Sequence, residues 1–202
     1  MNTSTYRRTA AAGLAAVALT AVGCSNGANV GVSAQPQVAL IVTSQVPAPS
    51  PDVKLIGERD VEVTLTGPIA AKYSSATDTQ KATLGKPLTG DHNAGTRDSG
   101  VVFQQFQGGA IVAKNDDAGT PAYIISGKVR EAWNVQRDTD GVPSATGSNG
   151  SAGPLGVVTS DETAIDGQLV TTFEHGKIAY NTTTGQVEVT VNGKVVPSGL
   201  PS

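Results

Sequence analysis

The sequence predicts an α+β fold, in which short helices and β-hairpins alternate within one small domain. The chain has 24 glycines and 11 prolines among 202 residues, a content that excludes a bundle of long helices. Residues 61–66 alternate apolar and polar side chains, the period of a half-buried strand. Segments of this kind recur in an internal repeat of about 60 residues. Strands, turns and short helices therefore occur in the same order more than once.

Composition limits the class of partner. Hydrophobic residues make up 38% of the chain and charged residues only 15%, with a formal net charge of -3. So little charge is atypical of a disordered polyelectrolyte and favours a folded domain with polar, glycine-rich flanks. A nucleic-acid partner is not expected, because phosphate binding needs a basic face.

The N-terminus has the pattern of an export signal. Arg7 and Arg8 precede an apolar, alanine-rich run at 10–22, which is shorter than the roughly 20 residues that span a bilayer. Cys24, the single cysteine, follows three small or apolar residues at 21–23. This arrangement resembles the bacterial lipobox, which implies that residues 1–23 are removed and that Cys24 carries a diacylglycerol lipid. We therefore expect an exported protein held on the outer face of the membrane by lipid, although an incidental Cys24 is the alternative. The arginine pair leaves the general and the twin-arginine export routes both open.

Residues 24–52 are predicted to be a tether. They are rich in Ser, Gly, Ala, Gln and Pro and close with Pro47, Pro49 and Pro51, a composition that favours extended polyproline II structure. One apolar run, 38–42, is long enough for a short strand. It can dock on the domain or remain loose, and the sequence does not decide between these two states.

Three strand segments end at equivalent glycines. Residues 61–66, 123–126 and 187–192 each precede a glycine, and the first and third share the sequence Val-Glu-Val-Thr. Ile69 and Tyr73 lie four residues apart after the first glycine, and Val129 and Trp133 lie four apart after the second. This spacing places each pair on one face of a short amphipathic helix. We expect such a helix to follow each strand.

A second block of residues recurs between these strands. It begins with Leu-Gly and continues with Gly, five residues, Phe, two residues, Gly, one residue and Ile. The first copy comprises Leu84, Gly85, Gly100, Phe106, Gly109 and Ile111, and the second comprises Leu155, Gly156, Gly167, Phe173, Gly176 and Ile178. Apolar segments at 110–113 and 177–180 precede turn-rich stretches and predict β-hairpins. Residues 138–153 have few apolar side chains and are expected to form a flexible inserted loop.

Residues 154–162, followed by Phe173, Gly176, Ile178, Tyr180 and the pair at 184–185, closely resemble the LGFP repeat of actinobacterial envelope proteins. The resemblance covers about residues 60–193. It departs from the family pattern at Val157 and Val158, and at Lys86 in the first copy. The resemblance implies two LGFP-like repeats within a domain at 53–202, attached to cell-wall polysaccharide, with arabinogalactan the glycan we expect.

Asp91 and Glu162 occupy equivalent positions after the two Leu-Gly blocks and are the candidate ligand-binding residues. Their carboxylates can accept hydrogen bonds from sugar hydroxyls, or instead from backbone amides of their own loops. The aromatic side chains are expected in the core rather than stacked on sugars; these are Tyr73, Phe106, Trp133, Phe173 and Tyr180.

We predict no catalytic residues, no cofactor and no metal site. His92 and His175 do not occupy equivalent positions and have no metal-ligand spacing, and nucleophile-elbow and nucleotide-binding motifs are absent from the sequence. The hypothesis is therefore a noncatalytic envelope lipoprotein that binds or braces wall polysaccharide. Two alternatives remain: a small envelope hydrolase with its site near Asp91 and His92, and an accessory subunit that binds another secreted protein.

Overall fold

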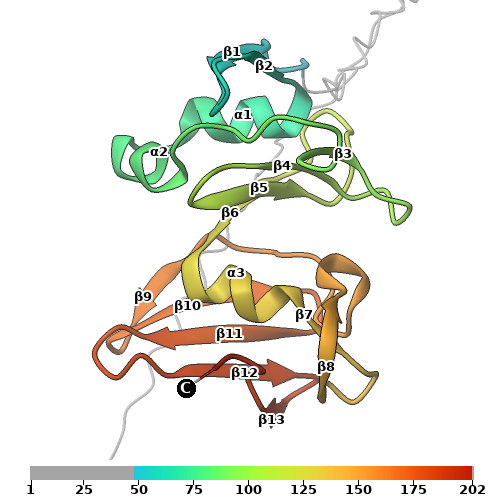
Figure 1. The fold of residues 1–202 in the computed structure, drawn as a ribbon, viewed down its shortest axis with the longest axis vertical. Coiled ribbons are helices and arrows are strands. Elements are labelled where there is room, and N and C mark those ends of the chain that lie inside the picture. The colour runs from blue at the N-terminus through green and yellow to red at the C-terminus, as the bar shows by residue number, and fades with distance from the viewer. Residues whose placement is uncertain (1–47, 202) are drawn as a thin grey trace, which may run out of the picture. The chain divides into compact units, whose positions relative to one another are not determined.

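The computed structural model describes residues 48–201, which form three α-helices, thirteen strands and one short 3-10 helix. The fold is therefore α+β in the broad sense but mostly β (Figure 1). The expected signal segment, Cys24 and the apolar run at 38–42 lie outside the described residues.

The N-terminal layer combines a two-stranded sheet with two helices. Strand β1 (Val53–Ile56) pairs antiparallel with β2 (Glu62–Leu65), and α1 (Gly67–Ser75) follows directly. Pro68 lies in the first turn of α1, where its missing N–H is not needed. Helix α2 (Asp78–Leu84) begins with a capping box in which Thr77 and Gln80 exchange hydrogen bonds. This layer contains the first of the predicted helices.

The middle sheet has the strand order β3-β4-β5-β6. Its strands are β3 (Ala94–Thr96), β4 (Val102–Gln105), β5 (Gly109–Ala113) and β6 (Ala122–Ser126). Every residue of β5 is buried, because the sheet is covered on both faces. Figure 1 shows this sheet between α1 and α2 on one side and α3 (Gly127–Asn134) on the other. The predicted hairpin here is confirmed as β5 and β6, and the predicted helix after it as α3.

Residues 138–153, expected as a loop without regular structure, contain a strand and a helical turn. Strand β8 (Pro143–Ser148) pairs with β7 (Val135–Arg137), and the 3-10 helix η1 (Gly150–Ala152) follows. The prediction missed them because it counted apolar side chains, whereas this hairpin is held by polar contacts. Asn149, for example, donates from Nδ2 to the Arg137 carbonyl at 2.9 Å.

The C-terminal sheet has five antiparallel strands in the order β13-β12-β11-β10-β9. They are β9 (Thr163–Ile165), β10 (Gln168–Phe173), β11 (Gly176–Asn181), β12 (Val187–Val191) and β13 (Lys194–Val196). After Gly193 the chain turns back as β13, so the expectation of a helix after each repeated strand is wrong for the third one. At the positions that hold the apolar pairs of α1 and α3, the segment after Gly193 has Val195 and Gly199, and Pro197 lies between them.

Within residues 48–201 the buried apolar side chains form two hydrophobic clusters and not one common core. One cluster includes Leu65, Leu84 and Phe106 and lies between the middle sheet and the N-terminal helices. The other includes Val112, Trp133 and Phe173 and joins α3 to the middle and C-terminal sheets. The middle sheet contributes one face to each cluster, because successive strand residues point to opposite faces.

Equivalent positions of the two sequence copies make the same contacts. Phe106 stacks on Tyr73 with ring centroids 5.8 Å apart, and Phe173 stacks on Trp133 at 6.0 Å. All four rings belong to the two clusters, and the predicted core positions of Phe106, Trp133 and Phe173 are confirmed.

The backbone hydrogen bonds are matched as well. The amide of Gln107 donates to the Lys86 carbonyl at 3.0 Å, and Glu174 donates to Val157 at 3.0 Å. In the reverse direction, the Lys86 amide donates to Oε1 of Gln107 and the Val157 amide to Oε2 of Glu174, both at 3.1 Å. The two loops that begin with Leu-Gly are therefore closed in the same way.

The repeated glycine of the Phe-x-x-Gly spacing has a steric cause. A Cβ at Gly176 would overlap the Thr190 carbonyl, and one at Gly109 would lie 2.8 Å from the Ile125 carbonyl. Each hypothetical Cβ also approaches the buried leucine of the same copy, Leu84 or Leu155. Only glycine lets the hairpin strand and the Leu-Gly loop come this close.

Candidate functional site

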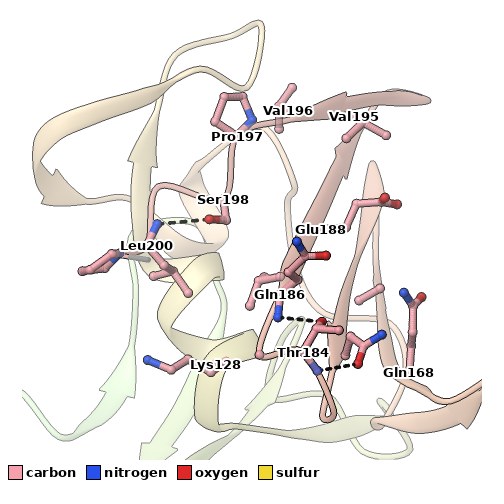
Figure 2. A pocket seen from close by; sticks show the side chains of 15 residues that line it. Lys128, Gln168, Thr184, Gln186, Glu188, Val195, Val196, Pro197, Ser198 and Leu200 are labelled. Atoms are coloured by element: carbon pink, nitrogen blue, oxygen red, sulfur yellow. Dashed lines mark hydrogen bonds between the residues drawn. The ribbon is translucent and has the colours of Figure 1, made fainter.

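The largest described cavity is an open groove of about 590 Å³, which we call the C-terminal groove (Figure 2). Its lining comes from α3, from strands β10 to β13 and from the segment after β13. The lining residues are Lys128, Gln168, Ala179, Asn181, Thr184, Gly185, Gln186, Val187, Glu188, Val195, Val196, Pro197, Ser198, Leu200 and Pro201. The groove therefore combines amide, hydroxyl and charged side chains with an apolar surface.

Three amide side chains form a row across the sheet. Gln168 of β10 pairs with Asn181 of β11, and the Asn181 amide donates to the carbonyl of Gln186, which precedes β12. Directly opposed residues of antiparallel strands present their side chains on the same face. The side chains of Gln168 and Gln186 can each donate and accept hydrogen bonds, as a sugar hydroxyl also does, whereas Asn181 has its amide N–H groups to offer.

The turn beside this row is held by short-range hydrogen bonds. Oδ1 of Asn181 accepts from the backbone amides of Thr183 and Thr184 at 2.9 and 3.0 Å, and Oγ1 of Thr184 accepts from the amide of Gln186 at 3.3 Å (Figure 2). Asn is suited to such a position because its side chain replaces a missing backbone acceptor in the turn. These hydrogen bonds fix the side chain of Asn181 and the turn between Asn181 and Gln186.

The opposite wall of the groove is the segment after β13, and Arg137 anchors it. Arg137 is buried, and its guanidinium donates to the carbonyls of Pro197 at 2.8 Å and Ser198 at 2.6 Å. The same group donates to the Gly141 carbonyl at 3.0 Å. Burial lowers the pKa of Arg137, but an arginine remains charged at physiological pH. Arg137 thus connects the β7–β8 hairpin to the groove wall.

Asp91 and Glu162 are both exposed and do not line the C-terminal groove. Asp91 lies in the loop between α2 and β3, and Glu162 directly precedes β9. Burial of its carboxyl group raises the pKa of Glu162, although the residue as a whole is exposed. Within the described residues neither carboxylate accepts a hydrogen bond from its own loop, so the alternative role of loop anchor has no support.

Asp161, the neighbour of Glu162, makes the contact that the sequence did not predict. One of its carboxylate oxygens accepts from Lys72 of α1, and Oδ1 accepts from the backbone amide of Ile124 in β6 at 2.8 Å. It therefore joins the segment before β9 to both α1 and β6. The repeat alignment concealed it, because the equivalent residue of the first copy is Gly90.

The groove residues were also missed by sequence reasoning. That reasoning followed the repeated glycines and aromatics, whereas Gln168, Asn181 and Gln186 are not repeated at matching positions. The available signal was that Asn181 and Gln186 border the turn between the predicted strand segments 177–180 and 187–192.

Residues 48–201 hold no group of three or more His, Cys, Asp or Glu side chains arranged to bind a metal ion. Within the same residues, no helix has the length and apolar character needed to cross a bilayer.

The LGFP repeat family model matches residues 84–141, which confirms the predicted LGFP repeat for this part of the chain. The matched range begins at the Leu-Gly block of the first copy and includes the middle sheet, α3 and β7. No curated protein matches the chain. The presence of an LGFP repeat is consistent with a repeat protein of the cell envelope.

Proposed function

We propose that the protein is a noncatalytic cell-envelope lipoprotein whose LGFP-like repeats bind or brace cell-wall polysaccharide, and that the C-terminal groove is the principal glycan site. The observation that carries this proposal is the row of amides at Gln168, Asn181 and Gln186, which lines the largest described groove of a chain that contains an LGFP repeat.

The proposal includes a second, divergent repeat at about residues 155–193. Its support is the matched set of contacts described above: the stacked aromatic pair, the reciprocal Leu-Gly loop hydrogen bonds and the close-packed hairpin glycine. In this reading the first repeat retains the family sequence, while the second has diverged and carries the groove.

The form of the groove suits a polysaccharide. Its volume of about 590 Å³ lies within the usual range of roughly 300–1,000 Å³ for ligand sites. The apolar side chains of Val187, Val196 and Leu200 offer contact with C–H faces of sugars, while the amide row offers hydrogen bonds to hydroxyls.

Asp91 and Glu162 remain proposed as additional glycan contacts, apart from the groove. They lie at matching positions of the two copies and both are exposed. Two weak contacts on one body raise affinity through effective concentration, and several copies on one membrane raise it further.

The anchor completes the proposal. Lipid on Cys24 would hold the chain to the membrane, and a tether at 24–52 would reach roughly 90 Å if fully extended at about 3.1 Å per residue. A tether of that length would hold the repeats away from the membrane and toward the wall, with the lipid on the outer face of the membrane.

Co-sedimentation with insoluble wall polysaccharide tests the proposal. We compare the wild-type protein with Gln168→Ala/Gln186→Ala, with Asp91→Asn/Glu162→Gln, and with the exposed control Gln136→Ala. We expect the groove variant to lose most of its retention, the carboxylate variant to lose part of it, and the control to retain it. Unchanged sedimentation of the groove variant would reject the groove as the site, and no retention of wild type on glycan with or without arabinogalactan would reject glycan binding.

A further inference from the structure

A second, smaller cavity lies at the junction of the middle sheet and α3, away from the C-terminal groove. Its volume is about 40 Å³, and it is lined by Arg97, Val101, Phe103, Gln105, Ala110, Val112, Arg130, Trp133 and Asn134. Two guanidinium groups and two carboxamides thus share a small cavity whose other lining residues are apolar or aromatic.

Both arginines are held by neutral neighbours. The guanidinium of Arg97 lies over the ring of Phe103, 4.7 Å from its centroid. Nη2 of Arg130 donates to Oε1 of Gln105 at 2.6 Å, and Gln105 in turn donates from Nε2 to the His92 carbonyl at 3.3 Å. Among the residues that the structure describes, neither arginine forms an ion pair with a carboxylate.

This arrangement leaves positive charge without compensation. Arg130 is half-buried, and burial lowers its pKa, the direction expected when no anion stabilises the charge. Arg97 is exposed, so solvent screens its repulsion with Arg130, and the half-buried charge of Arg130 without an anionic partner is the main unfavourable contribution. An anion in the cavity would compensate this charge, and the planar fork of arginine is suited to the two oxygens of a carboxylate.

We propose that the cavity between Arg97 and Arg130 binds the carboxylate group of a small acidic ligand. A volume of about 40 Å³ admits a small group such as a carboxylate. Asn134 lies on the same cavity wall and offers a neutral donor beside the two cations. This site is independent of the glycan groove and of its function.

Trp133 makes the proposal directly measurable. It is the single tryptophan of the chain, it lines the cavity, and its indole N–H is fixed on the Gly156 carbonyl at 3.0 Å. The tryptophan fluorescence of the full chain is titrated with sodium acetate and with sodium glucuronate. Sodium chloride at equal ionic strength and glucose are the controls. Sodium phosphate tests whether the site prefers a phosphate to a carboxylate.

We expect a saturable fluorescence change with acetate and glucuronate, and none with chloride or glucose. Arg97→Gln and Arg130→Gln should each raise the dissociation constant at least tenfold, and Arg97→Lys should restore only part of the affinity because it lacks the planar fork. Arg59→Gln, which changes an arginine away from the cavity, should bind as wild type does. Circular dichroism verifies that each variant is folded. If Arg130→Gln fails to fold, Arg97→Gln alone tests the proposal, because Arg97 is exposed.

Absence of a saturable response to both carboxylates would overturn the proposal. An unchanged response in Arg97→Gln would do the same. Tighter binding of phosphate than of acetate and glucuronate would overturn the assignment to a carboxylate.

Discussion

Asp161→Ala should destabilise the domain more than its partial exposure suggests, because this carboxylate connects the segment before β9 to α1 and to β6. The side chain of Asp161 is 32% exposed and that of Lys72 only 15%. The substitution removes the acceptor of Lys72 and of the Ile124 amide, and both donors then remain without their partner. Hydrogen bonds to charged groups contribute about 1.5–3 kcal/mol each. With a reduction for solvent screening, we expect a loss of about 2–4 kcal/mol in the free energy of unfolding.

Urea denaturation followed by Trp133 fluorescence and by circular dichroism measures this loss. Asp161→Asn should cost about half as much, because its remaining oxygen can still accept from Ile124. The control Glu62→Gln removes an exposed ion pair with Lys54 and should change stability by less than about 1 kcal/mol. A double-mutant cycle with Lys72→Met should give a coupling energy near 1–2 kcal/mol between positions 72 and 161. A change below about 0.5 kcal/mol for Asp161→Ala, or zero coupling, would refute the idea that this contact stabilises the packing of the segment before β9 on α1.

Three further predictions concern the core, the pH dependence of stability and the anchor. Phe106→Ala and Phe173→Ala should each lower the free energy of unfolding by about 3–5 kcal/mol in the same urea denaturation, because each ring is buried and stacked. Unchanged stability with lost glycan binding would instead favour an exposed ring that stacks on sugars. Burial raises the pKa of Glu162, so this side chain binds a proton more readily in the folded protein than in the unfolded chain. The free energy of unfolding therefore falls as the pH rises through the folded-state pKa. Glu162→Gln should therefore raise the melting temperature at pH 7, with a difference that vanishes below about pH 4, and a lower melting temperature at pH 7 would contradict this sign. Cys24→Ala should move the protein from the membrane to the soluble exported fraction. Intact-mass measurement should show a diacylglyceryl group on the wild-type protein and none on the variant. An unmodified Cys24 within a retained N-terminus would reject the lipid anchor.

The sequence predicted the strands and helices that depend on the spacing of residues near one another in the chain. The alternation in residues 61–66 and 187–191 placed two strands, and the pairs four residues apart, such as Val129 and Trp133, placed two helices. The repeated spacing of Phe106 and Phe173 located equivalent core positions, because a buried ring and a close-packed glycine must be retained together.

Features that depend on distant segments were not predicted. The β7–β8 hairpin is held by Arg137 and Asn149, whose partners are backbone carbonyls that no sequence pattern reveals. The groove arises because β13 follows Gly193 where a helix was expected, and the C-terminal segment then lies beside the sheet. The contact of Asp161 with α1 and β6 likewise depends on how the segment before β9 packs against these two elements, which the sequence does not reveal.

Mapping of backbone and side-chain NMR shifts on addition of arabinogalactan fragments tests the central claim most directly, because one titration reports both binding and chemistry. The account predicts that the largest shifts lie at Gln168, Asn181, Gln186 and their neighbours in the C-terminal groove, and that the sugar signals remain those of intact fragments. Shifts confined to another face, or new sugar signals from cleaved fragments, would contradict it.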